Sequence, residues 1–179
     1  LVGLVKIRGK EIRVDANGGW TPAKAEEMIF HLSRLGVRII EQPTDLKYIK
    51  DWKHLKGKNE NVELFVDEGL KILKDYNKIS EYVDGVNIKM EKCGGIIEGM
   101  KIARQARVEK KKILLGCMVE SSVGISQSVY MSSLADYFDL DGPQLLESDV
   151  AEGIRYDKES IEVDAEIIGG PKLKRDVIE

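Results

Sequence analysis

Short apolar runs alternate with longer amphipathic stretches along almost the whole chain, and this alternation restricts the chain to few folds. Successive runs start 22 to 27 residues apart, which leaves room for a helix between each pair. Strands that are apolar throughout and separated by helices predict a parallel sheet, either covered on both faces or wound into a barrel. The six expected strands are residues 12–16, 38–42, 63–68, 85–90, 112–117 and 137–141.

The clearest expected helix begins after Thr21, a good N-cap, with Pro22 at its first position, and stops at Gly36. Its apolar stripe consists of Ala25, Met28, Ile29, Leu32 and Leu35. Further helices are expected around residues 48–55, 71–80, 95–108 and 122–135. After about residue 150 the pattern changes to IRY, a DKE turn and SIEV, which predicts a hairpin, followed by a glycine-rich loop and a charged tail.

Composition excludes several functional classes. The net charge is −3, so the chain lacks the basic field that attracts nucleic acid, and no apolar run approaches the roughly 18 to 20 residues of a membrane span. Cys93 and Cys117 belong to no metal-binding or disulfide pattern, so we expect buried thiols and, with no export signal, a cytoplasmic protein. No GxGxxG, Walker, GxSxG or HExxH motif is present, which argues against dinucleotide, nucleotide, serine-hydrolase and zinc-protease chemistry.

Length alone favours an open sheet, because a complete eight-unit barrel typically needs about 250 residues and this chain of 179 supplies six units. The acidic residues favour the barrel. Asp15, Glu41 and Asp67 each end an apolar strand and follow one another at intervals of 26. In a barrel the three side chains converge at the C-terminal edge, whereas in an open sheet consecutive strands can lie on opposite sides of a switch point. We therefore expect an α/β fold, a partial (β/α)8 barrel of about six of the eight units.

Three neighbouring carboxylates cannot all stay ionised without a cation, and an all-oxygen set suits Mg²⁺, with Mn²⁺ as the other candidate. The implied cofactor is therefore a divalent ion held by Asp15, Glu41 and Asp67. The alternative is that each residue caps a helix or lies in solvent at a strand end.

Lys89 ends the fourth strand and faces the same edge, so it could donate or accept a proton if burial and a nearby metal lowered its pKa. The alternative is a surface lysine at a frayed strand end. Lys92, three residues later, is interpreted as a solvated group or as a neighbour of the site.

Further polar side chains follow the strands. Asp139 and Asp141 stand two residues apart on the sixth expected strand, so both would face the same side and could hold a cationic group such as a substrate ammonium. The alternative is that they are ordinary acidic residues of a loop. Glu120 could orient a base or cap the following helix. Asn17 and Gln42 stand next to the proposed metal ligands, where they could hydrogen-bond to them or serve only as turn residues.

Six sequence motifs resemble, in their order, the catalytic barrel of the enolase superfamily. They are VDANGGW, IIEQP, VDEG, GVNIKMEKCGG, GCMVESS and FDLDGP. The resemblance covers about residues 12 to 165 and is closest to the muconate-cycloisomerase-like branch, within it to the L-Ala-D/L-Glu dipeptide epimerases. It implies that Asp15, Glu41 and Asp67 hold Mg²⁺ and that Lys89 exchanges the α-proton. It also implies that Asp139 and Asp141 bind the ammonium group of a dipeptide substrate, which favours epimerisation over the alternatives of muconate cycloisomerisation and o-succinylbenzoate synthesis.

The sequence departs from that family at its start. The family's second catalytic lysine lies in a KxK word well before the position of Asp15, but only 14 residues precede Asp15 here and none of them forms that word. The capping domain and the first two barrel strands are absent as well. We therefore expect the C-terminal part of a longer, homo-oligomeric parent, with residues 1–153 as the partial barrel. Residues 154–179 would form a hairpin and tail that pack on the barrel or on the capping domain. The alternatives are an inactive truncated barrel and an open-sheet binding protein with an acidic edge.

Overall fold

The computed structural model describes residues 11–157, 160–164 and 170–174, and its main feature is a curved, fully parallel six-stranded sheet. Each strand pairs with the strands that precede and follow it in the sequence, in the order β1-β2-β3-β4-β5-β6. This is the partial barrel of six βα units that the sequence predicts. The strands are β1 (Arg13–Asp15), β2 (Ile39–Glu41), β3 (Glu63–Val66), β4 (Gly85–Lys89), β5 (Lys112–Gly116) and β6 (Tyr137–Asp139).

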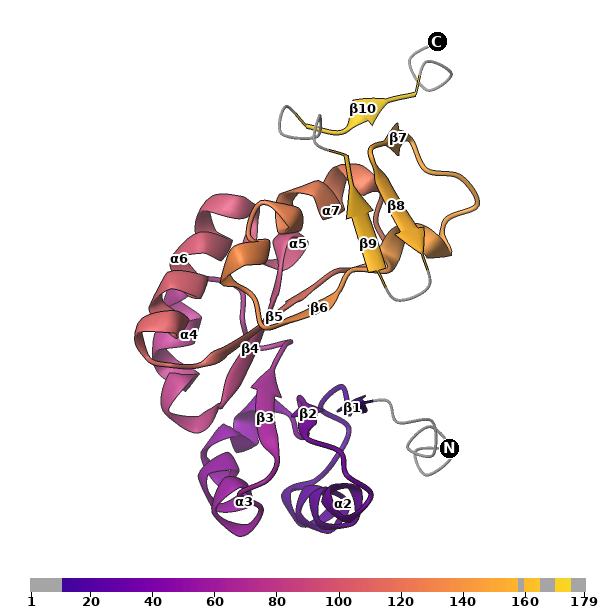
Figure 1. The fold of residues 1–179 in the computed structure, drawn as a ribbon. Helices are drawn as coiled ribbons and strands as arrows, with labels where there is room; N and C mark the ends of the chain where they lie inside the picture. The colour runs from indigo at the N-terminus through magenta and orange to yellow at the C-terminus, as the bar shows by residue number, and fades with distance from the viewer. Residues whose placement is uncertain (1–10, 158–159, 165–169, 175–179) are drawn as a thin grey trace.

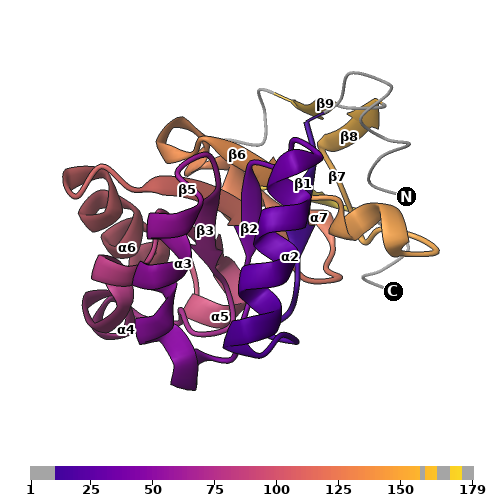
Figure 2. The same ribbon diagram turned by 90° about the horizontal axis from the view of Figure 1, so that it is seen from below.

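Helices connect consecutive strands and lie on the convex side of the curved sheet (Figure 1). Figure 2 shows α2 running beside the first strands, with α3, α4 and α6 continuing the outer layer. Among the described residues, no helix combines the length and the apolar character that a membrane crossing would need. The α-helices are α2 (Pro22–Arg34), α3 (Trp52–Lys58), α4 (Leu73–Ile79), α5 (Met90–Cys93), α6 (Ile96–Val108) and α7 (Ser122–Val129). The 3₁₀ turns are η1 (Leu46–Asp51), η2 (Ser80–Tyr82), η3 (Ser132–Leu134) and η4 (Gly142–Leu145).

Helix α2 begins and ends where the sequence predicts. The Thr21 hydroxyl accepts a hydrogen bond from the Lys24 amide at 3.3 Å, and Gly36 takes the left-handed conformation at φ 86°. Leu35 is the exception to the predicted apolar stripe, because it forms the C-cap of the helix and is 41% exposed.

Two expected helices are each divided into a 3₁₀ turn and an α-helix. The stretch around residues 48–55 forms η1 followed by α3, because the Asp45 carboxylate caps the Lys47 amide at 2.9 Å and starts the tighter turn. The buried Trp52 then fixes the start of α3 by donating from its indole nitrogen to the Thr44 hydroxyl at 2.8 Å. The stretch 122–135 forms α7 and then η3.

Alternation along the strands separates two apolar layers. Side chains on the convex face form the main core with the helices, including Ile40, Leu64 and Ile113, all of which are buried. A smaller cluster fills the concave face of the sheet below the carboxylates, where the Phe65 and Tyr137 rings meet edge to face with centroids 6.0 Å apart. The smaller cluster supports the base of the concave face.

Side chains of the two outer strands meet across the concave face. The Arg13 guanidinium of β1 donates to the Phe138 carbonyl of β6 at 3.0 Å and lies 5.8 Å from the Tyr137 ring centroid. The sheet is therefore curved strongly enough for one side chain to reach from its first strand to its last.

The predicted hairpin is present as β8 (Ile154–Asp157) paired antiparallel with β9 (Ser160–Val163). It lies beside β6 (Figure 1), and the Tyr156 hydroxyl donates to the Leu140 carbonyl at 2.7 Å. A second small pair joins β7 (Ala151–Glu152) to β10 (Lys172–Leu173). Residues 158–159, 165–169 and 175–179 lie outside the described residues, and the division into two segments at residue 153 stays a prediction.

We expect Gly85→Ala to lower the free energy of unfolding by about 1 to 3 kcal/mol. A Cβ at Gly85 would lie 2.3 Å from the Phe65 ring, which must then move within the concave cluster. Urea denaturation followed by circular dichroism measures the change. The same substitution in a Phe65→Leu background should cost less, because the smaller side chain leaves room. An equal loss in both backgrounds would contradict this account of the cluster.

Candidate functional site

The three predicted metal ligands end adjacent strands at the C-terminal edge of the sheet. Parallel pairing sets Asp15 directly opposite Glu41, and Asp67 follows the last residue of β3. Glu41 is 8% exposed and Asp67 is 4% exposed, whereas Asp15 lies open to solvent. Burying ionisable groups is costly unless they are paired, so this edge of the sheet needs charge compensation.

The negative charge of Glu41 is the least compensated of the three carboxylates. Burial raises the pKa of Glu41 to about 7, and although a hydrogen bond from Asn87 opposes this, the charges of Asp67 and Asp15 add to it. The Asn87 amide nitrogen donates to Oε1 of Glu41 at 2.7 Å. The carboxyl group is thus held by a neutral donor, without a cation hydrogen-bonded to it among the described contacts.

Asp67 instead binds two ammonium groups. Lys89 Nζ lies 2.9 Å from Oδ2, while Lys92 Nζ contacts Oδ1 and the Asp67 carbonyl oxygen, the latter at 2.7 Å. Burial lowers the pKa of Lys89, but the bond to Asp67 and the nearby carboxylates outweigh it, so the pKa lies above its usual value. The role predicted for Lys89 was conditional on burial and a nearby metal lowering this pKa, and burial alone does not lower it here, because the ion pair with Asp67 outweighs burial. Burial dominates at Lys92 and lowers its pKa.

The residues at this edge suit a divalent cation in their chemistry. All the candidate ligand atoms are carboxylate oxygens, the donors that Mg²⁺ and Mn²⁺ prefer. A cation would stabilise the ionised form of Glu41, whose pKa is raised by burial and, to a smaller extent, by the charges of Asp67 and Asp15. Among residues 11–157, 160–164 and 170–174, no three His, Cys, Asp or Glu side chains are already grouped as a metal site. Both carboxylate oxygens of Asp67 contact lysine ammonium groups instead.

Asn17 and Gln42 lie beside the carboxylates in left-handed backbone, with φ values of 47° and 38°. Such conformations are strained for residues other than glycine and are frequent at functional sites. The backbone N–H of Asn17 donates to Oδ1 of Asp15 at 2.8 Å. The backbone N–H of Asp67 donates to the side-chain oxygen of Gln42 at 3.0 Å. Each residue therefore helps to fix the position of one proposed metal ligand.

Glu120, predicted to bind substrate or orient a base, lies between β5 and α7. Burial and a hydrogen bond with Glu91 raise its pKa to about 8, and its Oε1 atom is buried without a hydrogen-bond partner in the part of the chain that the structure describes.

Asp139 stands level with Gly116 at the end of β6, and burial raises its pKa although Arg13 partly offsets the shift. Asp141 lies beyond the strand, at the N-cap of η4. The predicted alternation therefore does not extend to it, because β6 is shorter than expected.

Asn87 is the polar residue of the site that our sequence analysis did not single out. It stands two residues before Lys89 on β4, and side chains two apart on a strand share a face. An amide in an otherwise apolar buried strand, in phase with Lys89, was the available signal.

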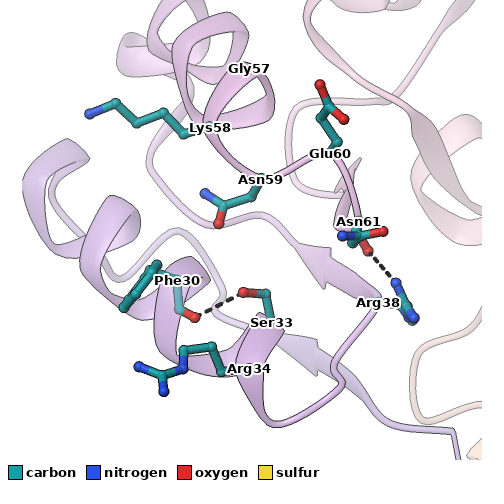
Figure 3. Close-up of a pocket in the computed structure, with 9 residues that line it drawn as sticks. All are labelled: Phe30, Ser33, Arg34, Arg38, Gly57, Lys58, Asn59, Glu60 and Asn61. Carbon is teal, nitrogen blue, oxygen red and sulfur yellow. Dashed lines mark hydrogen bonds between the residues drawn. The ribbon is translucent and has the colours of Figure 1, made fainter.

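The volumes of the surface pockets do not identify the site. A hollow of about 560 Å³ lies at the opposite, N-terminal edge of the sheet, between the end of α2 and the loop before β3 (Figure 3). Its lining includes Phe30, Arg34 and Arg38, and Arg38 donates to the Asn61 carbonyl. At the carboxylate edge, a smaller hollow of about 240 Å³ is lined partly by Asn17, Gln42 and other residues of the strand-end loops.

Comparison with known proteins gives concordant results. The family model described as "Enolase C-terminal domain-like" matches residues 5–166. The chain is 39% identical over 149 residues to the hydrophobic dipeptide epimerase of Roseobacter litoralis, covering 83% of this chain and 43% of that protein.

Two solved structures share the fold. One is a substrate-liganded complex of the L-Ala-D/L-Glu epimerase from Bacillus subtilis, with a TM-score of 0.79 and 26% identity over 91% of this chain and 46% of that one. The other is the N-succinyl Arg/Lys racemase from Bacillus cereus, with a TM-score of 0.81 and 31% identity over 94% of this chain and 47% of that one. The chain thus spans slightly less than half the length of these relatives.

Glu41→Gln should stabilise the chain at high pH in the absence of divalent cations. The folded chain holds the Glu41 proton more tightly than the unfolded chain, whose carboxyl pKa is near 4.5, so folding loses stability as the pH rises from there through about 7. At pH 8 we expect the variant to exceed the wild type by up to about 3 kcal/mol in free energy of unfolding, and to match it near pH 4. Urea denaturation across this pH range measures the difference. A difference that does not change with pH would contradict the raised pKa.

Proposed function

The chain belongs to the enolase C-terminal domain-like family, and on that premise we propose that it is the C-terminal barrel part of a divalent-metal-dependent dipeptide epimerase. The observation that carries the proposal is the placement of Lys89, whose Nζ lies 2.9 Å from Oδ2 of Asp67 at the edge where Asp15 and Glu41 also end their strands. The relatives from Roseobacter litoralis and Bacillus subtilis are both named as epimerases of dipeptides, which supports a dipeptide as the substrate class.

Asp15, Glu41 and Asp67 are the residues that would hold the cation. Mg²⁺ at this position would supply positive charge that stabilises the enediolate formed when the α-proton leaves a substrate carboxylic acid. The carboxylates themselves would orient the substrate by fixing that charge at the strand ends.

Lys89 would move the α-proton at its Nζ atom. Its bond to Asp67 favours the protonated ammonium, which can return a proton to carbon. Loosening this bond lowers the pKa of Lys89 and so increases the fraction of neutral amine, the form that can abstract a proton. The strength of the contact between Lys89 and Asp67 therefore decides which direction of proton transfer the lysine favours.

Asp139, the last residue of β6, and Asp141, two residues beyond it, supply negative charge that would bind the ammonium group of a dipeptide. The same charge would disfavour a succinylated amino group, which carries a carboxylate. Dipeptide epimerisation is thus favoured over the reaction class of the Bacillus cereus racemase.

Incubation with L-Ala-L-Glu and Mg²⁺ in D₂O, followed by proton NMR, tests the proposal directly. We expect the full chain to exchange the α-proton of the second residue, and Lys89→Ala to lower the exchange rate by about 10² to 10⁴-fold. Lys101→Ala is the matched control, because that lysine forms an exposed ion pair with Glu98 on α6. Exchange in Lys89→Ala at the wild-type rate would exclude the assigned role.

A second substrate tests the acidic pair. Replacement of Asp139 and Asp141 by asparagine should slow exchange of the dipeptide by at least about tenfold and should not slow exchange of N-succinyl-lysine. The exchange rates of both substrates, measured by the same NMR assay, give the comparison. Equal losses for the two substrates would contradict ammonium recognition by these carboxylates. Chains with no exchange of either substrate, although folded, would instead support the inactive truncated barrel.

A further inference from the structure

Asn87 links two strands that are not neighbours. It lies on β4, is 2% exposed, and its Nδ2 donates to Oε1 of Glu41 on β2 at 2.7 Å. Strand β3 lies between these two in the sheet, so the amide reaches across the concave face above Phe65. The contact depends on the curvature of the sheet.

The other end of the same amide has no partner among the described residues. Asn87 Oδ1 is buried and accepts no hydrogen bond from any of them, which is an unfavourable arrangement in a folded chain. A side chain needed only to fill this space would be better apolar, as Leu114, the register partner of Asn87 on β5, is. The amide is therefore of use mainly through the bond that its nitrogen donates.

Gly116 on β5 makes room for this amide. A Cβ at Gly116 would lie 2.4 Å from Oδ1 and 2.9 Å from Nδ2 of Asn87. Gly116 has no positive φ, so alanine suits its backbone, and the lack of a side chain matters for the space alone.

We propose that Asn87 is a positioning residue for Glu41, and that Gly116 provides the space that sets the position of its amide. The bond fixes Oε1 of Glu41 and leaves Oε2 to bind a divalent cation. The inference rests on the proposed function, in which Glu41 is a metal ligand, and adds the residue that sets the orientation of that ligand.

Binding of Mn²⁺ alone to the full chain, measured by electron paramagnetic resonance and calorimetry, tests the inference without any use of activity. We expect Asn87→Ala to weaken Mn²⁺ binding by about 10 to 100-fold. Gly116→Ala should weaken it about tenfold by displacing the amide, and should add nothing in the Asn87→Ala background, because both changes act through one side chain.

Gly57→Ala is the matched control. It also adds one methyl group, but on α3, where no atom lies within 4 Å of the added carbon, so it should leave the Mn²⁺ affinity unchanged. Circular dichroism checks that each chain is folded, and Asn87→Ser replaces Asn87→Ala if the latter does not fold.

The outcomes separate this inference from the function on which it rests. A wild-type chain that is folded but binds no Mn²⁺ would overturn the metal site and the role of Asn87 together. Binding by the wild type with equal affinity in the Asn87 variant would overturn the positioning role alone. Losses from the two substitutions that simply add would also overturn it, since Gly116 would then act independently.

Discussion

Parallel pairing in a fixed register is the constraint on which the rest of the structure depends. Because each strand pairs with the next one along the chain, residues at the ends of β1, β2 and β3 come to one edge of the sheet although about 26 residues separate them in the sequence. A slip of one residue in the pairing of β1, β2 or β3 would turn a carboxylate into the helix layer and an aliphatic side chain onto the concave face. The chemistry of the edge is therefore protected by the packing of the convex core, which such a slip would disrupt.

Charge is distributed unevenly within the site. Asp67 is bound by Lys89 and Lys92, whereas among the described contacts the similarly buried Glu41 has only the neutral amide of Asn87. Buried charges are tolerated when they are paired, so the site combines one satisfied carboxylate with one that carries an unfavourable electrostatic load. Such a difference between neighbouring carboxyl groups is common where a protein holds a cation or moves a proton.

Much of the fold follows from patterns local in the sequence. The six strands and the bounds of α2 could be predicted because apolar runs, Thr21, Pro22 and Gly36 act over a few residues. The division of the helix near Trp52 could not, because it depends on a contact with Thr44 that only the folded chain forms.

The site could be predicted only in part, for the same reason. The strand-end positions of Asp15, Glu41 and Asp67 were predictable from alternation, and their proposed roles stay predictions. The ion pairs of Asp67 and the reach of Asn87 across β3 depend on side-chain conformations and sheet curvature, which no spacing encodes. For the same reason the ion pair that raises the pKa of Lys89 could not be predicted from the sequence.

The contact of Arg13 with the Phe138 carbonyl has a consequence for the order in which the chain folds. Neighbouring strands are close in sequence, so each can dock on the one before it with a modest loss of chain entropy, whereas this bond joins residues 125 positions apart. Arg13 can reach its acceptor only after all the intervening strands have assembled and curved. Formation of this bond therefore belongs to the last stage of folding, and the topology of local steps followed by one distant closure favours progressive assembly along the chain.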